Sequence, residues 1–180
     1  EYLKNEGWYL DLVSNNEKRL ENSKNVLKYE KASFHSHDLC KGESIETITN
    51  NFDTPDLIVA NAGIAINGAI GKLNKKEKND AYYLMCGGVI DLIEGFVPRM
   101  MDNGGGRIVI ISSIGAITAM PKSSIYSSIK SGIHSYGRSI ASELKNKNIS
   151  VTISMPGYVI TNAHKRAGLE HLEKKVPKWM

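Results

Sequence analysis

The chain has 180 residues, of which 41% are hydrophobic and 23% charged, and its formal net charge is +4. This composition is typical of a globular domain with one hydrophobic core, and because the lysines are scattered along the chain we do not expect nucleic acid as a partner. No apolar run approaches the ~18 residues that span a bilayer, and no secretory signal opens the sequence. Cys40 and Cys86 have no metal-ligand spacing. We therefore expect no bound metal, no membrane association, and reduced thiols in a cytoplasmic protein.

Strand-like and helix-like patterns alternate along the chain. The predicted strands are 8–13, 32–37, 56–60, 107–111 and 150–155, and the predicted helices are 17–29, 44–52, 75–101 and 124–145. We expect Ser44 to cap its helix, the strand at 56–60 to be buried on both faces, and Pro98 to mark the weak end of the long helix. This alternation predicts an α/β fold with a doubly wound, Rossmann-like parallel sheet in three α/β/α layers.

A tyrosine and a lysine lie four positions apart in the predicted helix 124–145. Tyr126 and Lys130 should therefore stack on one helix face, about 6 Å apart along its axis. A free tyrosine titrates near pH ~10, but a neighbouring ammonium favours the phenolate and lowers the pKa of the phenol. Ser113 follows the predicted strand 107–111, which could bring its hydroxyl beside the phenol. The Tyr-x-x-x-Lys spacing alone is weak, because a solvated lysine one turn from a half-buried tyrosine gives the same pattern.

Other motifs accompany this pair at fixed spacing. Asn61-Ala62-Gly63 follows the strand at 56–60, Ser113 lies 13 residues before Tyr126, and Pro156-Gly157 begins 30 residues after it. Together these motifs resemble the short-chain dehydrogenase/reductase family, enzymes that move a hydride between a nicotinamide dinucleotide and an alcohol or carbonyl.

The resemblance implies roles for three catalytic residues. Tyr126 would exchange a proton with the substrate oxygen. Lys130 would lower the pKa of the tyrosine and bond the nicotinamide ribose, while Ser113 would hold the substrate oxygen. Ser112 is an alternative for the serine role, but the 13-residue spacing between Ser113 and Tyr126 favours Ser113.

The resemblance also assigns cofactor-binding positions. Asn15 stands where an acidic residue selects NAD and a basic residue selects NADP. Lys18 and Arg19 could reach a 2′-phosphate, whereas Asp11 is expected to point elsewhere, so NADP is favoured and NAD stays open. The other cofactor-binding positions are Asp38 and Leu39 at the adenine, Asn61, Ala62 and Gly63 beside its ribose, and Pro156, Gly157, Val159 and Thr161 at the nicotinamide, together with Tyr126 and Lys130. A solvated aspartate at position 38 and an ordinary turn at 61–63 are the alternatives.

The sequence departs from the family pattern at one catalytic position. The family carries an asparagine 24 residues past Asn61, and Met85 occupies that position. A thioether cannot hold the water that the asparagine is thought to organise for a proton relay to the lysine. Either the relay follows another route or activity is reduced.

Family members begin about twenty residues earlier, with a strand and a Gly-x-x-x-Gly-x-Gly turn that meets the cofactor pyrophosphate. In the family's strand order, that strand lies between the two strands that match 8–13 and 56–60. Its absence would leave unpaired backbone groups, each costing ~1–3 kcal/mol. We therefore expect residues 1–180 to form a single, partial dinucleotide-binding domain of a longer chain. The family's substrate-binding segment after Thr161 is also mostly lacking, and the sequence does not predict which substrate is used.

The function predicted from these residues is hydride transfer between NAD(P)(H) and a secondary alcohol or ketone. The long predicted helices 75–101 and 124–145 resemble those that form the family's dimer interface, which implies a homodimer or homotetramer. Two alternatives stay open. One is a dinucleotide-binding or structural relative without turnover, and the other is a fragment that binds no dinucleotide.

Overall fold

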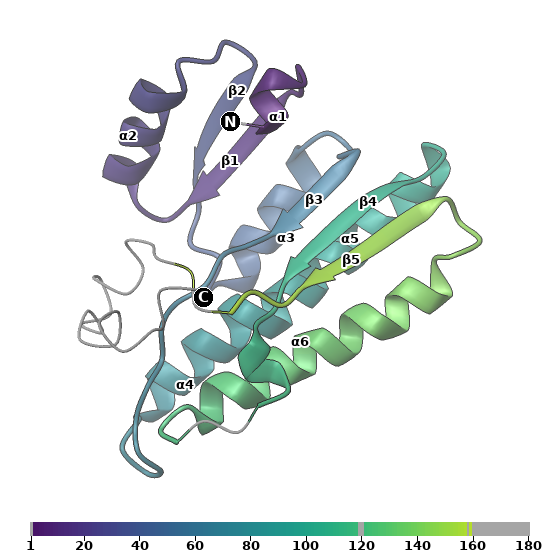
Figure 1. Cartoon of the computed structure of the whole chain (residues 1–180). Helices are drawn as coiled ribbons and strands as arrows, with labels where there is room; N and C mark the ends of the chain where they lie inside the picture. Colours follow the sequence, from purple (N-terminus) through teal and green to yellow (C-terminus); the bar gives the residue numbers. More distant parts are fainter. Residues whose placement is uncertain (1, 119–120, 158, 160–180) are drawn as a thin grey trace.

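A computed structural model of the chain describes residues 2–118, 121–157 and 159, which form a parallel α/β fold (Figure 1). The strands are β1 (Leu10–Ser14), β2 (Ala32–Ser36), β3 (Leu57–Ala60), β4 (Gly106–Ile111) and β5 (Ile149–Ser154). The α-helices are α1 (Tyr2–Asn5), α2 (Glu17–Leu27), α3 (Gly42–Asn51), α4 (Lys75–Tyr82), α5 (Gly88–Asp102) and α6 (Ser124–Glu143), with a π-helix η1 (Tyr83–Gly87) and a 3₁₀ helix η2 (Ile114–Ala116). The alternation of strands and helices confirms the predicted Rossmann-like α/β class.

The strands form two separate parallel sheets. β1 pairs with β2, while β4 lies between β3 and β5 in a three-stranded sheet. Among the described residues, β1 and β3 are therefore edge strands of different sheets. The division falls between β1 and β3, which are the two strands that we expect to flank a further central strand.

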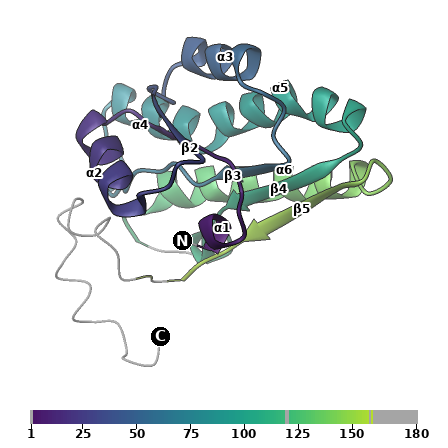
Figure 2. The same cartoon turned by 90° about the horizontal axis from the view of Figure 1, so that it is seen from above.

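Helices cover one face of the three-stranded sheet. Figure 2 shows α3, α5 and α6 on the same side of β3, β4 and β5. Ile58, Ile108 and Ile110 point into this core and are buried. Gly137 lets α6 approach the sheet, because an added Cβ would lie 2.8 Å from Cγ1 of Ile153.

The expectation that residues 56–60 are buried on both faces is wrong. Val59 is 47% exposed, whereas its neighbours Ile58 and Ala60 are buried. Successive side chains of a strand point to opposite faces, so the described helices cover only one side of β3.

The predicted helix 75–101 is interrupted. An Asn74–Glu77 capping box opens α4, and the π-helix η1 then separates α4 from α5. Pro98 lies inside α5 rather than at its end, because packing of the buried Phe96 and Met100 outweighs the local cost of proline.

The predicted cap of α3 is also wrong. The helix begins at Gly42 with Lys41 at the N-cap, so the chain turns before it reaches Ser44.

Within the part of the chain that the structure describes, no helix is both long and apolar enough to cross a bilayer.

Candidate active site

The candidate site lies at the carboxyl end of β4, where Ser112 and Ser113 follow the strand. The two serines make different contacts. The buried Ser112 hydroxyl donates to the Lys130 carbonyl oxygen at 3.0 Å, so it fastens α6 to the end of the strand. Ser113 Oγ caps η2 by accepting from the Gly115 N–H at 3.1 Å, which leaves its hydroxyl proton available for donation.

Lys130 is buried, with only 6% of its surface exposed. Its Nζ donates to the Ile111 carbonyl oxygen at 2.8 Å. Burial disfavours the charged ammonium and lowers the pKa of Lys130. An ammonium has three N–H donors, so two remain after the bond to Ile111.

Tyr126 lies in the first turn of α6 and is half-buried against the hydrophobic core. It is one helical turn before Lys130, which places both residues on the same helix face. The Ser131 hydroxyl donates to the Ala116 carbonyl oxygen of η2, so the loop that contains Ser113 is fastened to α6. The structure thus brings the Ser113 loop and the Tyr126–Lys130 turn to one place.

Met85 and Cys86 enter this region from the π-helix. Met85 is buried, and its Sδ lies 3.6 Å from the position of an added Cβ on Gly63. The thioether therefore fills the space beside the Asn61-Ala62-Gly63 turn. Burial raises the pKa of the Cys86 thiol, and the positive charge of Lys130 opposes that rise.

The residues expected at the adenosine end follow β1. Asn15 is exposed directly after the strand, and Lys18 and Arg19 are exposed in the first turn of α2. The Asp11 carboxylate is engaged by β2, because its Oδ1 lies 2.8 Å from His35 Nε2.

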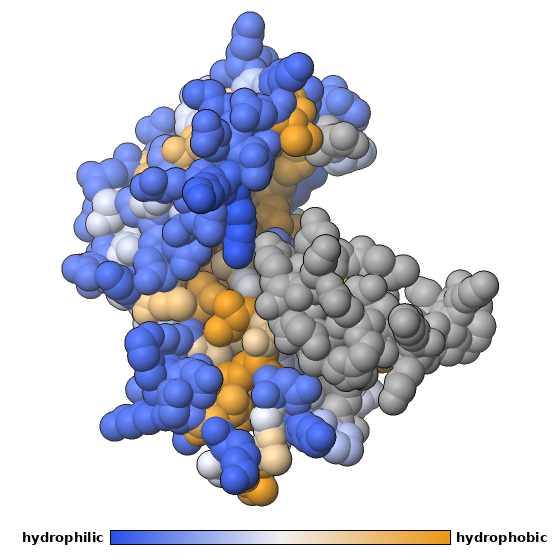
Figure 3. All heavy atoms as spheres, turned by 90° about the vertical axis from the view of Figure 1, so that its left-hand side faces the viewer, coloured by the Kyte–Doolittle hydropathy of each residue, from blue (hydrophilic) through white to orange (hydrophobic). Residues whose placement is uncertain are grey.

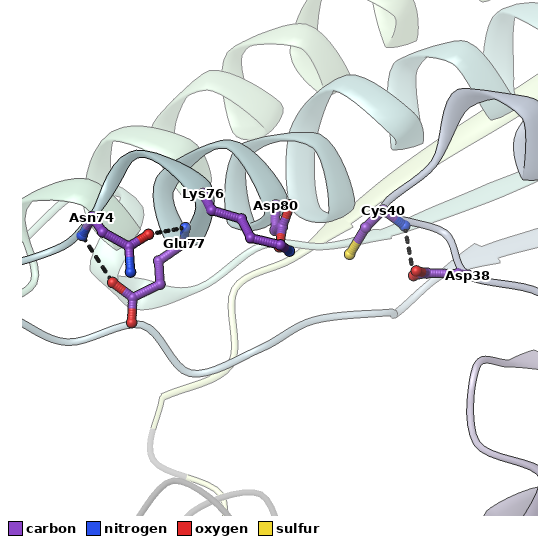
Figure 4. A network of polar contacts seen from close by, with 6 residues as sticks. All are labelled: Asp38, Cys40, Asn74, Lys76, Glu77 and Asp80. Carbon is purple, nitrogen blue, oxygen red and sulfur yellow. Dashed lines mark hydrogen bonds and ion pairs between the residues drawn. The ribbon is translucent and has the colours of Figure 1, made fainter.

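Asp38 lies in the loop after β2, and Leu39 beside it packs against the core. Figure 4 shows Asp38 Oδ1 accepting from the Cys40 N–H, with Lys76 and Asp80 of α4 nearby. Burial, with the neighbouring Asp38 carboxylate adding to it, raises the pKa of the Cys40 thiol to about 11. One Asp38 oxygen is thus already used inside the loop.

The turn expected at the nicotinamide follows β5. The Pro156 carbonyl oxygen accepts from the Ile114 N–H at 3.1 Å, which joins this turn to η2. An added Cβ on Gly157 would meet nothing within 4 Å, and Val159 is exposed. Thr161 lies outside the described residues.

These observations define a Rossmann-like α/β protein whose candidate site lies at the carboxyl edge of a parallel sheet. A family model described as short chain dehydrogenase matches residues 1–171. The chain belongs to the short-chain dehydrogenase family, whose members are NAD(P)-dependent oxidoreductases.

Individual relatives agree with this assignment. A 3-oxoacyl-(acyl-carrier-protein) reductase of Haemophilus influenzae is 31% identical over 124 residues, covering 67% of this chain and 51% of the relative. A short-chain dehydrogenase structure from Streptomyces avermitilis has a TM-score of 0.81 and 26% identity, covering 88% of this chain and 59% of the other. L-sorbose reductase of Gluconobacter frateurii, solved with NADPH and L-sorbose, has a TM-score of 0.84 and 24% identity, covering 99% of this chain and 70% of the other. The chain spans about half the length of the curated relatives it matches.

Sequence reasoning missed the contacts that hold the site together. No local pattern marks Ser112 as the partner of the Lys130 carbonyl, and none indicates that Cys86 lies near Lys130. These contacts join residues far apart in the sequence, and only the packing of η1 and α6 on the sheet creates them.

The Asp38–Cys40 contact gives a test of the electrostatics at the expected adenine end. Asp38→Asn removes a negative charge that disfavours the thiolate, so the pKa of Cys40 should fall and its alkylation at pH 8 should accelerate. A fall of one pKa unit corresponds to a roughly tenfold larger thiolate fraction. Iodoacetamide labelling of the Cys40 peptide, followed by mass spectrometry, measures the rate. Glu77→Gln is the matched control, and equal rates in the two variants would contradict this account.

Proposed function

We propose that the chain is the catalytic part of an NAD(P)(H)-dependent oxidoreductase that acts on a secondary alcohol or ketone. The observation that carries this proposal is the attachment of α6 to the end of β4 through Ser112 and Lys130. It holds the turn with Tyr126 and Lys130 next to the loop that contains Ser113. The three side chain types needed for carbonyl reduction therefore come from adjacent elements.

Each residue has a distinct role in the proposed reaction. The Tyr126 hydroxyl donates a proton to the carbonyl oxygen during reduction and accepts it during oxidation. The Ser113 hydroxyl donates a hydrogen bond to the same oxygen, since its contact with the Gly115 N–H leaves the hydroxyl proton available. Lys130 keeps one N–H on Ile111 and directs the others toward the phenol and a ribose.

The described residues suit the two ends of a nicotinamide dinucleotide. Gly157 would leave room for the nicotinamide end to approach the backbone, and Asp38 keeps one carboxylate oxygen for the adenine amino group. A bound dinucleotide would supply or accept the hydride. The exposed Lys18 and Arg19 favour NADP over NAD, and the NADPH complex of L-sorbose reductase is consistent with this choice.

We further propose that residues 1–180 are part of a larger dinucleotide-binding domain, in which another strand joins β1 to β3. The two unpaired strand edges support this, because a parallel sheet is stable when its backbone groups are paired. Intact-mass measurement of the native protein tests it. A folded species of only 19.9 kDa would contradict the proposal.

We also propose that the protein assembles as a homodimer or homotetramer through α5 and α6.

The alternative to the proposed activity is a dinucleotide-binding relative without turnover, and the replacement of the family's asparagine by Met85 favours this alternative. Protein that binds NADPH but oxidises none of it against a broad carbonyl panel would support this alternative.

Replacing the proposed proton donor should separate catalysis from folding. In the native full-length protein, Tyr126→Phe should lower kcat by roughly 10²- to 10⁴-fold, because the phenolic proton is lost. NADPH oxidation measured by absorbance gives kcat, and a thermal melt checks folding. Tyr82→Phe, at an exposed tyrosine of α4, should change neither. Equal turnover in wild type and Tyr126→Phe would favour the alternative without catalysis.

The cofactor preference should respond to position 15. Asn15→Asp adds a carboxylate that accepts from a ribose 2′-hydroxyl and repels a 2′-phosphate, so it should shift preference from NADPH to NADH. The difference in Tm with each dinucleotide measures this preference. Asn25→Asp adds the same charge farther along α2 and should leave the preference unchanged. No rise in Tm with either dinucleotide would instead indicate a fragment that binds none.

A further inference from the structure

The π-helix η1 separates α4 from α5, in a segment where the sequence predicts one continuous helix. The Gly88 N–H donates to the Tyr83 carbonyl oxygen five residues earlier, whereas an α-helical N–H bonds the carbonyl oxygen four residues earlier. The π-helix therefore contains one extra residue. Its loss would shift α4 relative to α5 by one residue, which is about 1.5 Å along the helix axis and about 100° around it.

The π-helix and the glycine that follows it contact three segments of the candidate site. These segments are the turn after β3, the loop after β2 and the helix α6. The position of an added Cβ describes each contact: on Gly63 it would lie 3.6 Å from Met85 Sδ, on Gly88 3.3 Å from the Leu39 carbonyl oxygen, and on Gly132 3.5 Å from Cys86 Sγ. The register of this one turn therefore sets how all three segments meet.

α4 is held by few apolar contacts of its own. Ala81 is its buried residue, whereas α5 buries Gly88, Val89, Ile93, Phe96 and Met100. Figure 3 shows the side on which α4 lies in Figure 1, and in its lower part, where α4 begins, hydrophilic residues lie on either side of a hydrophobic strip. The core thus fixes α5 firmly, and the register of α4 relative to α5 depends on a further contact.

Tyr83 supplies this contact. Its hydroxyl donates to Asp91 Oδ2 at 2.6 Å, and because Asp91 lies in the first turn of α5, the bond spans the π-helix. The ring fills the space that two glycines leave, since an added Cβ on Gly87 or Gly88 would lie 3.1 Å from one of its carbon atoms. Burial, with the bond to Asp91 adding to it, raises the pKa of Tyr83 to about 12, so the hydroxyl remains a donor at neutral pH.

We propose that Tyr83 is a positioning residue for the candidate site, because its bond to Asp91 fixes the register of the π-helix between α4 and α5. The bond holds the Met85 thioether beside Gly63 and the Cys86 thiol against α6. This inference rests on the proposed function only where it concerns turnover. The placement of the two sulfur atoms requires no activity, so it can be tested separately.

Reactivity of the Cys86 thiol reports the register of the π-helix. Cys86 is 4% exposed, and Tyr83→Phe removes the hydroxyl while the ring keeps its place. Iodoacetamide should then label Cys86 about three- to tenfold faster, because loss of one hydrogen bond changes a local opening equilibrium by roughly that factor. Mass spectrometry of the Cys86 peptide from the native full-length protein measures the rate. Asp91→Asn keeps an acceptor for the hydroxyl and should accelerate labelling less than Asp91→Ala.

Turnover measures the consequence for catalysis. For a carbonyl compound that the wild type reduces, Tyr83→Phe should lower kcat roughly ten- to hundredfold, because a small displacement of reacting groups costs that much. NADPH binding should also weaken, since Met85 no longer supports the turn expected beside the adenine ribose. NADPH oxidation gives kcat, and calorimetry gives the Kd of NADPH.

A second tyrosine provides the matched control. The Tyr136 hydroxyl donates to Glu94 Oε1 at 3.1 Å, which joins α6 to α5 without spanning the π-helix. Tyr136→Phe therefore removes the same kind of bond and should leave kcat, NADPH binding and Cys86 labelling unchanged. Thermal melts and size-exclusion chromatography check the folding and assembly of each variant.

The outcomes separate this inference from the proposed function. Unchanged Cys86 labelling in Tyr83→Phe would overturn the inference, and so would equal effects of Tyr83→Phe and Tyr136→Phe. Faster labelling with unchanged kcat and NADPH binding would show that Tyr83 only adds stability, and would overturn its positioning role. A wild type that binds NADPH without turnover would contradict the oxidoreductase, whereas faster labelling and weaker NADPH binding in Tyr83→Phe would still support the positioning role.

Discussion

The arrangement of the site depends on the attachment of one helix turn to the end of one strand. The Ser112 hydroxyl bonds the Lys130 carbonyl oxygen, and the Lys130 ammonium bonds the Ile111 carbonyl oxygen, so two contacts in opposite directions hold α6 against β4. Both donors are buried or nearly so, and loss of either would leave a polar group without its partner in a region of low dielectric. Gly137 makes the same approach possible farther along α6, where a larger side chain would collide with Ile153.

This attachment has an electrostatic consequence for the lysine. Burial of Lys130 lowers its pKa, and the bond to Ile111 compensates part of the lost hydration. On the family's usual pattern an asparagine would approach this region from the preceding helix. Here the π-helix brings the apolar Met85 against Gly63 and the Cys86 thiol toward Lys130. The thioether of Met85 has no N–H donor, so it cannot make the hydrogen bonds that an asparagine amide would make there.

The two ends of the three-stranded sheet are chemically different. Its carboxyl edge has Ser112 and Ser113 and the exposed Ile114 and Ile117, while its amino edge has Asp56, Arg107 and Lys145 around a cavity. All strands in a parallel sheet run the same way, so every loop that follows a strand contributes to the same edge. Sequence segments that lie far apart along the chain can thus meet at one edge of the sheet.

The sequence by itself determined the order of strands and helices, the family, and the positions of the candidate residues. The motifs around Asn61, Ser113 and Tyr126 can be read from the sequence, because each is a short run of residues and their separations along the chain are those of the family. The same reasoning expects Asp11 to point away from the cofactor, and in the structure its carboxylate contacts His35 of the neighbouring strand β2. The roles of Ser113, Tyr126 and Lys130 remain predictions.

Only the tertiary structure decided which groups meet. The π-helix in the predicted helix 75–101, the acceptance of Pro98 inside α5 and the exposure of Val59 all follow from which surfaces pack together. The division of the sheet between β1 and β3, in contrast, falls where the family's strand order predicts it. Local patterns report the periodicity of one segment, whereas hydrogen bonds and burial depend on partners from distant segments. The backbone can therefore be anticipated from the sequence, but the contacts that hold Lys130 in place cannot.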